Sequence, residues 1–208
     1  MSASPYGSIE QRCAIYEFWA HRGRAIECYS TLEQSQCSLL AVLSGMHESA
    51  AGTVFFKITA SRSRSAILDK LFKKKFGDKF RPFWNSLINH FAYLDQRRNE
   101  LVHWGVVVRL GDGPEKYSLT PPNFWEFNEN SPEWKREDFV DFMNRCDVVG
   151  RTLNMFTFPM RVKELPPEVL PPEQDPLFQG PLEYPLPPDH RLARLPSMPI
   201  IPPPPWEA

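Results

Sequence analysis

Apolar residues recur at helical spacing through most of the first 160 positions of the chain. Residues three or four apart lie on one face of a helix, so this spacing predicts helices that bury one side. A change to strand-like alternation, with Gly-Asp-Gly-Pro at residues 111–114, predicts a small β-hairpin over residues 106–119. We therefore expect an all-α bundle with a β-hairpin insertion. The helices are predicted over residues 9–22, 25–45, 48–58, 63–76, 81–104 and 136–156.

The end of the chain has a different composition. Fifteen of the 22 prolines lie at or after Pro166, and the apolar residues among them follow neither a helical nor a strand period. Proline fixes φ and removes a backbone donor, so such a segment favours polyproline II or disorder. We predict a helical domain over residues 1–162 and a disordered, proline-rich tail over residues 163–208, whose removal leaves the domain folded.

Overall charge and cysteine spacing indicate a soluble, cytoplasmic protein. The 24 basic and 25 acidic residues nearly cancel, and no signal peptide or stretch long enough to cross a membrane is present. The four cysteines lack C-x-x-C or metal-ligand spacing, which is typical of reduced thiols. No cofactor or metal is expected. The cysteines are Cys13, Cys28, Cys37 and Cys146.

Positive charge is concentrated in one segment just before the helix predicted over residues 81–104. Nine basic residues lie between Lys57 and Arg81 against two acidic ones, a net of seven positive charges in 25 residues. Such a cluster attracts phosphate backbones, although a lysine-rich helix is also typical of a merely solvated face. The candidate nucleic-acid contacts are Lys70, Lys73, Lys74, Lys75, Lys79 and Arg81.

Candidate chemistry lies at the end of the same helix, in Arg98, Asn99 and His103. Arg98 falls within the apolar stripe, four residues after Leu94 and three before Leu101, so it is expected to face the core. A helix C-terminus favours a positively charged imidazole. A guanidinium, an amide and an imidazole on one helix end are able to hold a phosphate and move a proton beside it.

This Arg-Asn-x-x-x-His sequence at the end of a core helix resembles the R-x4-6-H motif of the HEPN superfamily. The family is all-helical, and many members are metal-independent ribonucleases that act as homodimers. The resemblance implies that Arg98, Asn99 and His103 are catalytic, with Glu33 as a polar partner of the arginine. Helical spacing adds Asp95 as a supporting residue, one turn before Asn99 on the same line of the helix. The resemblance also implies RNA as substrate, a role as a toxin or phage-defence effector, and an antitoxin protein as a further partner.

Two other interpretations stay open on the same residues. In the first, the chain is a catalytically silent HEPN-like module that dimerises or binds a partner, with Arg98 paired to Glu33 and His103 capping the helix. In the second, it binds nucleotides without cleaving them. Exposure separates the ribonuclease from the silent module, because an active site needs Arg98 and His103 both to reach one solvent-open cleft.

Overall fold

The computed structural model describes residues 9–109, 116–122, 132–162, 164–166 and 169–193 of the chain. Over these residues the protein is mostly helical with one antiparallel hairpin, as the sequence predicted. The turn expected at residues 111–114 lies outside the described residues. The elements are α1 (Ile9–Ser44), α2 (Glu48–Phe55), α3 (Ser61–Phe76), α4 (Arg81–His103), β1 (Gly105–Arg109), β2 (Lys116–Thr120), α5 (Arg136–Arg161) and a short 3-10 helix, η1 (Pro176–Phe178).

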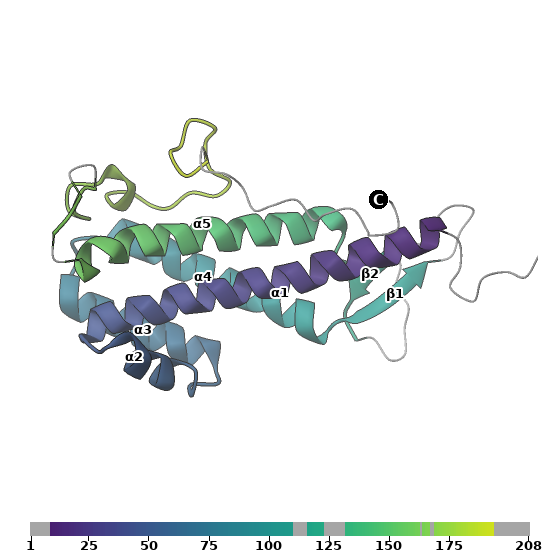
Figure 1. Cartoon of the computed structure of the whole chain (residues 1–208), viewed down its shortest axis with the longest axis horizontal. Helices are drawn as coiled ribbons and strands as arrows, with labels where there is room; N and C mark the ends of the chain where they lie inside the picture. The colour runs from purple at the N-terminus through teal and green to yellow at the C-terminus, as the bar shows by residue number, and fades with distance from the viewer. Residues whose placement is uncertain (1–8, 110–115, 123–131, 163, 167–168, 194–208) are drawn as a thin grey trace, which may run out of the picture.

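Helix α1 extends along the bundle, and α5 lies beside it in the same chain direction (Figure 1). Ring contacts between Phe18 and Phe139, at 5.9 Å, and between Tyr29 and Phe142, at 6.4 Å, hold the two together. Helix α4 runs in the opposite direction, so its C-terminal end lies near the first half of α1. The hairpin follows α4 at that end, while α2 and α3 cover the other end (Figure 1).

The first two predicted helices are one continuous helix of 36 residues. The sequence predicted two helices, over residues 9–22 and 25–45, and Gly23 between them is a residue that lowers helix stability. Packing overrides this local preference, since Phe18 before the glycine and Ala25 and Cys28 after it are all buried. The helix ends where Gly45 adopts a φ of +71°, a left-handed conformation that favours glycine.

These two glycines give a matched pair of variants. A Cβ added at Gly23 meets no atom within 4 Å, whereas Gly45 has positive φ. We expect Gly23→Ala to raise the free energy of unfolding by about 0.5–1 kcal/mol and Gly45→Ala to lower it by about 1 kcal/mol. Urea unfolding followed by circular dichroism measures both. A loss of stability in Gly23→Ala would contradict a continuous helix through that position.

An aromatic cluster fills the end of the core that lies against α3. The ring of Phe156 on α5 lies 5.1 to 5.6 Å from five other phenylalanine rings. Four of these come from α3, α4 and the turn between them, and the fifth, Phe178, comes from η1 in the proline-rich segment. The five are Phe72, Phe76, Phe80, Phe83 and Phe178.

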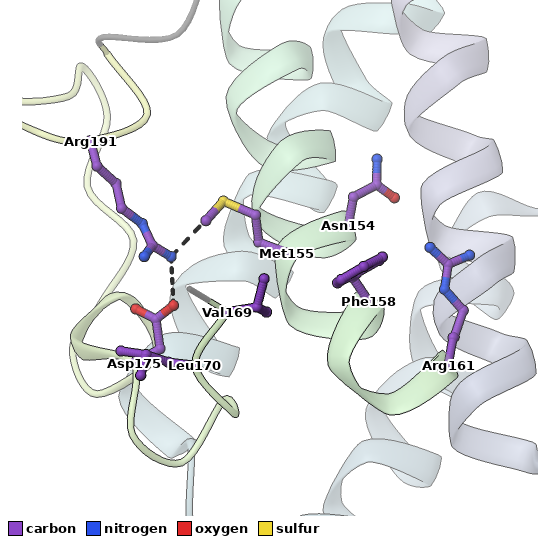
Figure 2. Close-up of a pocket in the computed structure, with 8 residues that line it drawn as sticks. All are labelled: Asn154, Met155, Phe158, Arg161, Val169, Leu170, Asp175 and Arg191. Atoms are coloured by element: carbon purple, nitrogen blue, oxygen red, sulfur yellow. Dashed lines mark hydrogen bonds and ion pairs between the residues drawn. The ribbon is translucent and has the colours of Figure 1, made fainter. Parts of the chain in front are cut away.

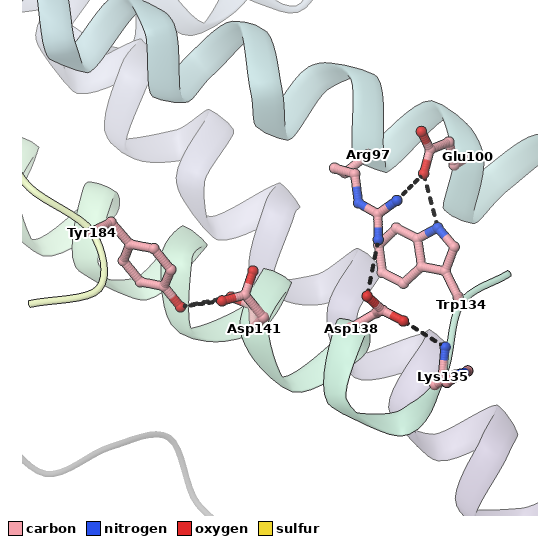
Figure 3. Close-up of polar contacts among 7 residues, drawn as sticks. All are labelled: Arg97, Glu100, Trp134, Lys135, Asp138, Asp141 and Tyr184. Atoms are coloured by element: carbon pink, nitrogen blue, oxygen red, sulfur yellow. Dashed lines mark hydrogen bonds and ion pairs between the residues drawn. The ribbon is translucent and has the colours of Figure 1, made fainter. Parts of the chain in front are cut away.

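Disorder of the tail predicted over residues 163–208 is therefore not confirmed. Phe178 and Leu182 are buried, and the Leu182 backbone bonds to both Ser86 Oγ, at 2.7 Å, and His90 Nε2, at 3.1 Å. The Tyr184 hydroxyl also donates to Asp141 of α5, at 3.0 Å (Figure 3). Single apolar residues without a period anchor this segment, so a search for periodicity does not detect them. Residues 194–208 lie outside the described residues.

Candidate functional site

The motif occupies the last two turns of α4, where Arg98 lies at the border between core and solvent. Its neighbours Leu94 and Leu101 are fully buried, whereas Arg98 is only partly buried. Its guanidinium lies 5.8 Å from the centre of the Tyr29 ring on α1. One of its nitrogens donates to Asn99 Oδ1 at 3.4 Å, and Asn99 itself is exposed.

The acidic residues expected to support Arg98 have other partners. Glu33 accepts a 2.5 Å hydrogen bond from Arg64 of α3, and no ion pair joins it to Arg98 among the described residues. Asp95 accepts from the Tyr29 hydroxyl, and burial together with this neighbouring carboxylate raises the pKa of Tyr29. Asp95 and Arg98 both contact Tyr29, and no ion pair joins the two among the described residues.

The arginine held in a charged network is Arg97, one residue earlier. It forms ion pairs with Glu100, at 2.5 Å, and with Asp138 of α5, at 3.6 Å, and its guanidinium lies 4.0 Å from the centre of the Trp134 ring (Figure 3). Trp134 Nε1 also donates to Glu100 at 2.9 Å. This network fixes the last turns of α4 against the start of α5. Sequence analysis missed it because Trp134 and Asp138 are more than 30 positions away.

A second arginine that sequence analysis missed closes the end of α4. Arg22 of α1 donates from Nε to the Leu101 carbonyl, at 3.0 Å, and from Nη2 to the Val102 carbonyl, at 3.4 Å. Partial burial lowers the pKa of Arg22. Arg22 therefore caps the end of α4, a role that His103 does not fill. The His103 imidazole is exposed and has no hydrogen-bonding or ionic partner among the described residues.

The predicted basic cluster lies at the far end of α4. Arg81 and His103 are 22 residues apart on one helix, about 33 Å at 1.5 Å per residue. Several of the charges are also paired: Lys73 with Asp69 at 2.8 Å, Lys79 with Glu173 at 3.2 Å, and Arg81 with Asp78 at 3.8 Å. Lys75 donates to the Val42 carbonyl. Lys70 and Lys74 are exposed without a partner in the described part of the chain.

A cavity of about 340 Å³ lies between the last turns of α5 and the docked tail (Figure 2). Met155, Phe158 and Leu170 form an apolar wall. Its two arginines already have acidic partners, Arg161 with Glu48 at 2.7 Å and Arg191 with Asp175 at 2.6 Å. None of the motif residues lines this cavity, so it is a separate feature of the fold. Its lining consists of Asn154, Met155, Phe158, Arg161, Val169, Leu170, Asp175 and Arg191.

Comparison of the chain with protein-family models, curated proteins and solved structures gives no match. Within the described residues, no three His, Cys, Asp or Glu side chains are grouped so that they could ligate a metal ion. No helix in the same part of the chain combines the length and apolarity needed to span a bilayer.

Proposed function

We propose that the chain is a metal-independent endoribonuclease of HEPN type whose catalytic residues are Arg98, Asn99 and His103. The observation that carries this proposal is the exposure of His103, an unpartnered imidazole at the end of α4 whose helix-capping role Arg22 already fills. Arg98, five residues earlier on the same helix, is partly exposed. Neither motif side chain is sealed in the core, which supports the proposal, although no cavity described for the protein holds the two together.

The proposed reaction uses the nucleophile that RNA itself carries, the 2′-hydroxyl beside the scissile phosphate. His103 takes the proton from this hydroxyl, or gives one to the departing 5′-oxygen. Arg98 stabilises the charge that develops on the phosphate, and Asn99 orients the substrate. Attack by the 2′-oxygen breaks the bond from phosphorus to the 5′-oxygen, leaving a 2′,3′-cyclic phosphate and a 5′-hydroxyl.

Proton removal and proton donation call for two groups, and each chain offers one motif histidine. A homodimer would supply the second. A stripe on α1 supports such a dimer: the exposed Ile15, Trp19 and Ile26 and the partly buried Arg22 follow the 4-3-4 spacing of a helix–helix seam. Arg22 joins this stripe to the end of α4, beside the exposed Val102. A two-fold axis along the stripe would bring two motifs near one another.

Toxin or defence activity, with an antitoxin as partner, belongs to the same proposal.

The stripe gives a direct prediction about association. Trp19 is 48% exposed, so a charge there costs the isolated chain little but would be buried and unpaired in the dimer. We expect the wild type to have twice the mass of the 24.1 kDa chain and Trp19→Glu to have the mass of one chain. Light scattering coupled to size exclusion measures this, and Val54→Glu, an exposed site on α2, is the control. A monomeric wild type would contradict the dimer.

The activity itself is tested by incubating the purified protein with end-labelled RNA in EDTA. The ribonuclease proposal predicts cleavage that the chelator does not suppress. Because the motif does not line the cavity described above, a catalytically silent module is the second candidate function. A folded, dimeric wild type that cuts no RNA would favour that module.

A further inference from the structure

The cavity between the last turns of α5 and the docked tail leaves apolar surface open to solvent (Figure 2). Phe158 of α5 and Leu170 of the tail both line it, and these large side chains are 38% and 44% exposed. Its volume of about 340 Å³ lies at the lower end of the range for small-molecule sites, roughly 300–1,000 Å³. A short apolar chain would therefore fit the cavity and cover both side chains.

The charged side chains around this apolar wall offer donors rather than acceptors. Asp175 is buried, and its two oxygens already accept from the Leu177 N–H, at 3.0 Å, and from Arg191, at 2.6 Å. Arg191 and Asp175 thereby neutralise one side of the cavity. Arg161 lies on the other side (Figure 2) and donates from one nitrogen, to Glu48 at 2.7 Å. Its remaining N–H groups have no partner among the described residues.

Arg161 is able to exchange Glu48 for another anion. Their side chains are 34% and 60% exposed, and an exposed ion pair contributes little to stability. Arg161 follows Phe158 by three residues, so the two lie on one side of α5. The negative end of the α5 dipole opposes an anion there, but it carries partial charge, whereas the guanidinium carries a full one. Because the described lining has two arginines and one acid, its charge is complementary to an anion.

We propose that this cavity binds a small carboxylic acid with an apolar chain, in its ionised form. Arg161 would donate to the carboxylate, and the chain would lie between Phe158 and Leu170. Because α5 supplies one wall and the docked tail the other, the bound acid would also hold the tail against the helix. The proposal goes beyond ribonuclease activity and does not depend on it, since the motif residues lie outside this cavity.

The test is a titration of the full chain with octanoate, followed by calorimetry and by the Met155 methyl signal in ¹H–¹³C NMR spectra. The signal is assigned from its loss in Met155→Leu. We expect saturable binding that shifts this signal, and binding of octanol, which has the same chain without a charge, to be about tenfold weaker or more. Arg161→Gln is expected to weaken octanoate binding by about tenfold, because it removes a charge-assisted contact. Glu48→Gln should strengthen it, because it frees Arg161.

The control variant is Arg24→Gln, which removes an arginine of α1 that also pairs with an acidic residue, Glu27 at 2.9 Å, but lies outside the cavity. It is expected to bind octanoate as the wild type does. Arg161 is exposed, so its replacement does not threaten the fold. A Met155 signal that millimolar octanoate leaves unmoved would overturn the proposal. Equal affinity for octanoate and octanol, or equal affinity of the wild type and Arg161→Gln for octanoate, would also overturn it. None of these results depends on whether the protein cleaves RNA.

Discussion

Replacing Phe178 by alanine is expected to lower the free energy of unfolding by about 3–5 kcal/mol, the usual cost of removing a buried phenylalanine. Phe178 is 1% exposed, and its ring lies 5.1 Å from both Phe83 and Phe156. Its loss leaves a cavity where the docked segment meets α4 and α5. Urea unfolding, monitored by circular dichroism, gives the difference, and residues 163–208 stay present in both proteins.

The control for Phe178 lies in the same segment. Leu170 is 44% exposed, so Leu170→Ala is expected to change stability by less than about 1 kcal/mol. Truncation after Val162 should destabilise the protein at least as much as Phe178→Ala, since it also removes Leu182 and Tyr184. Wild-type stability in both Phe178→Ala and the truncated chain would mean that the segment does not dock.

Replacing His103 by alanine is expected to reduce RNA cleavage in EDTA by about 100-fold or more, the usual contribution of a general acid or base. The exposed imidazole has no partner among the described residues, so the fold should lose about 1 kcal/mol or less. The mutant should therefore stay folded and dimeric. A replacement of Arg98 would be harder to interpret than His103→Ala, because it would also remove the packing of the guanidinium over Tyr29.

His47→Ala is the matched control for this variant. His47 is also exposed, and its ring accepts from the Ser49 backbone N–H at the start of α2, so its loss costs a helix cap of about 1 kcal/mol. The variant should cleave RNA as the wild type does. Full cleavage by folded His103→Ala protein would remove His103 from the chemistry.

Helical periodicity predicted the helices of the bundle, because the apolar face that such a helix buries recurs in the sequence every three or four residues. Helix α4 begins at Arg81 with Pro82 in its first turn, and it ends at His103, one residue before the predicted end. The continuity of α1 through Gly23 could not be predicted locally, since it depends on contacts with α5. Docking of Phe178 depends on a cluster assembled from three other parts of the chain.

The candidate site was predictable in its residue types but not in its pairings. Spacing placed Arg98 within the apolar stripe of α4, yet Arg97 forms the shielded ion pairs because Trp134 and Asp138 lie on its side of the helix. Arg22 contacts the end of α4 from 79 positions away, which no local motif encodes. Sequence alone also cannot show which acidic residue an arginine reaches, as Glu33 and Arg64 demonstrate.

The chemistry at the ends of the RNA fragments tests the ribonuclease proposal most directly. Attack by the 2′-hydroxyl, with His103 moving the proton, leaves a 2′,3′-cyclic phosphate on one fragment and a 5′-hydroxyl on the other. Mass spectrometry of fragments released in EDTA should find these termini with the wild type and not with His103→Ala. Fragments ending in a 3′-hydroxyl and a 5′-phosphate, or no fragments at all, would contradict the proposal.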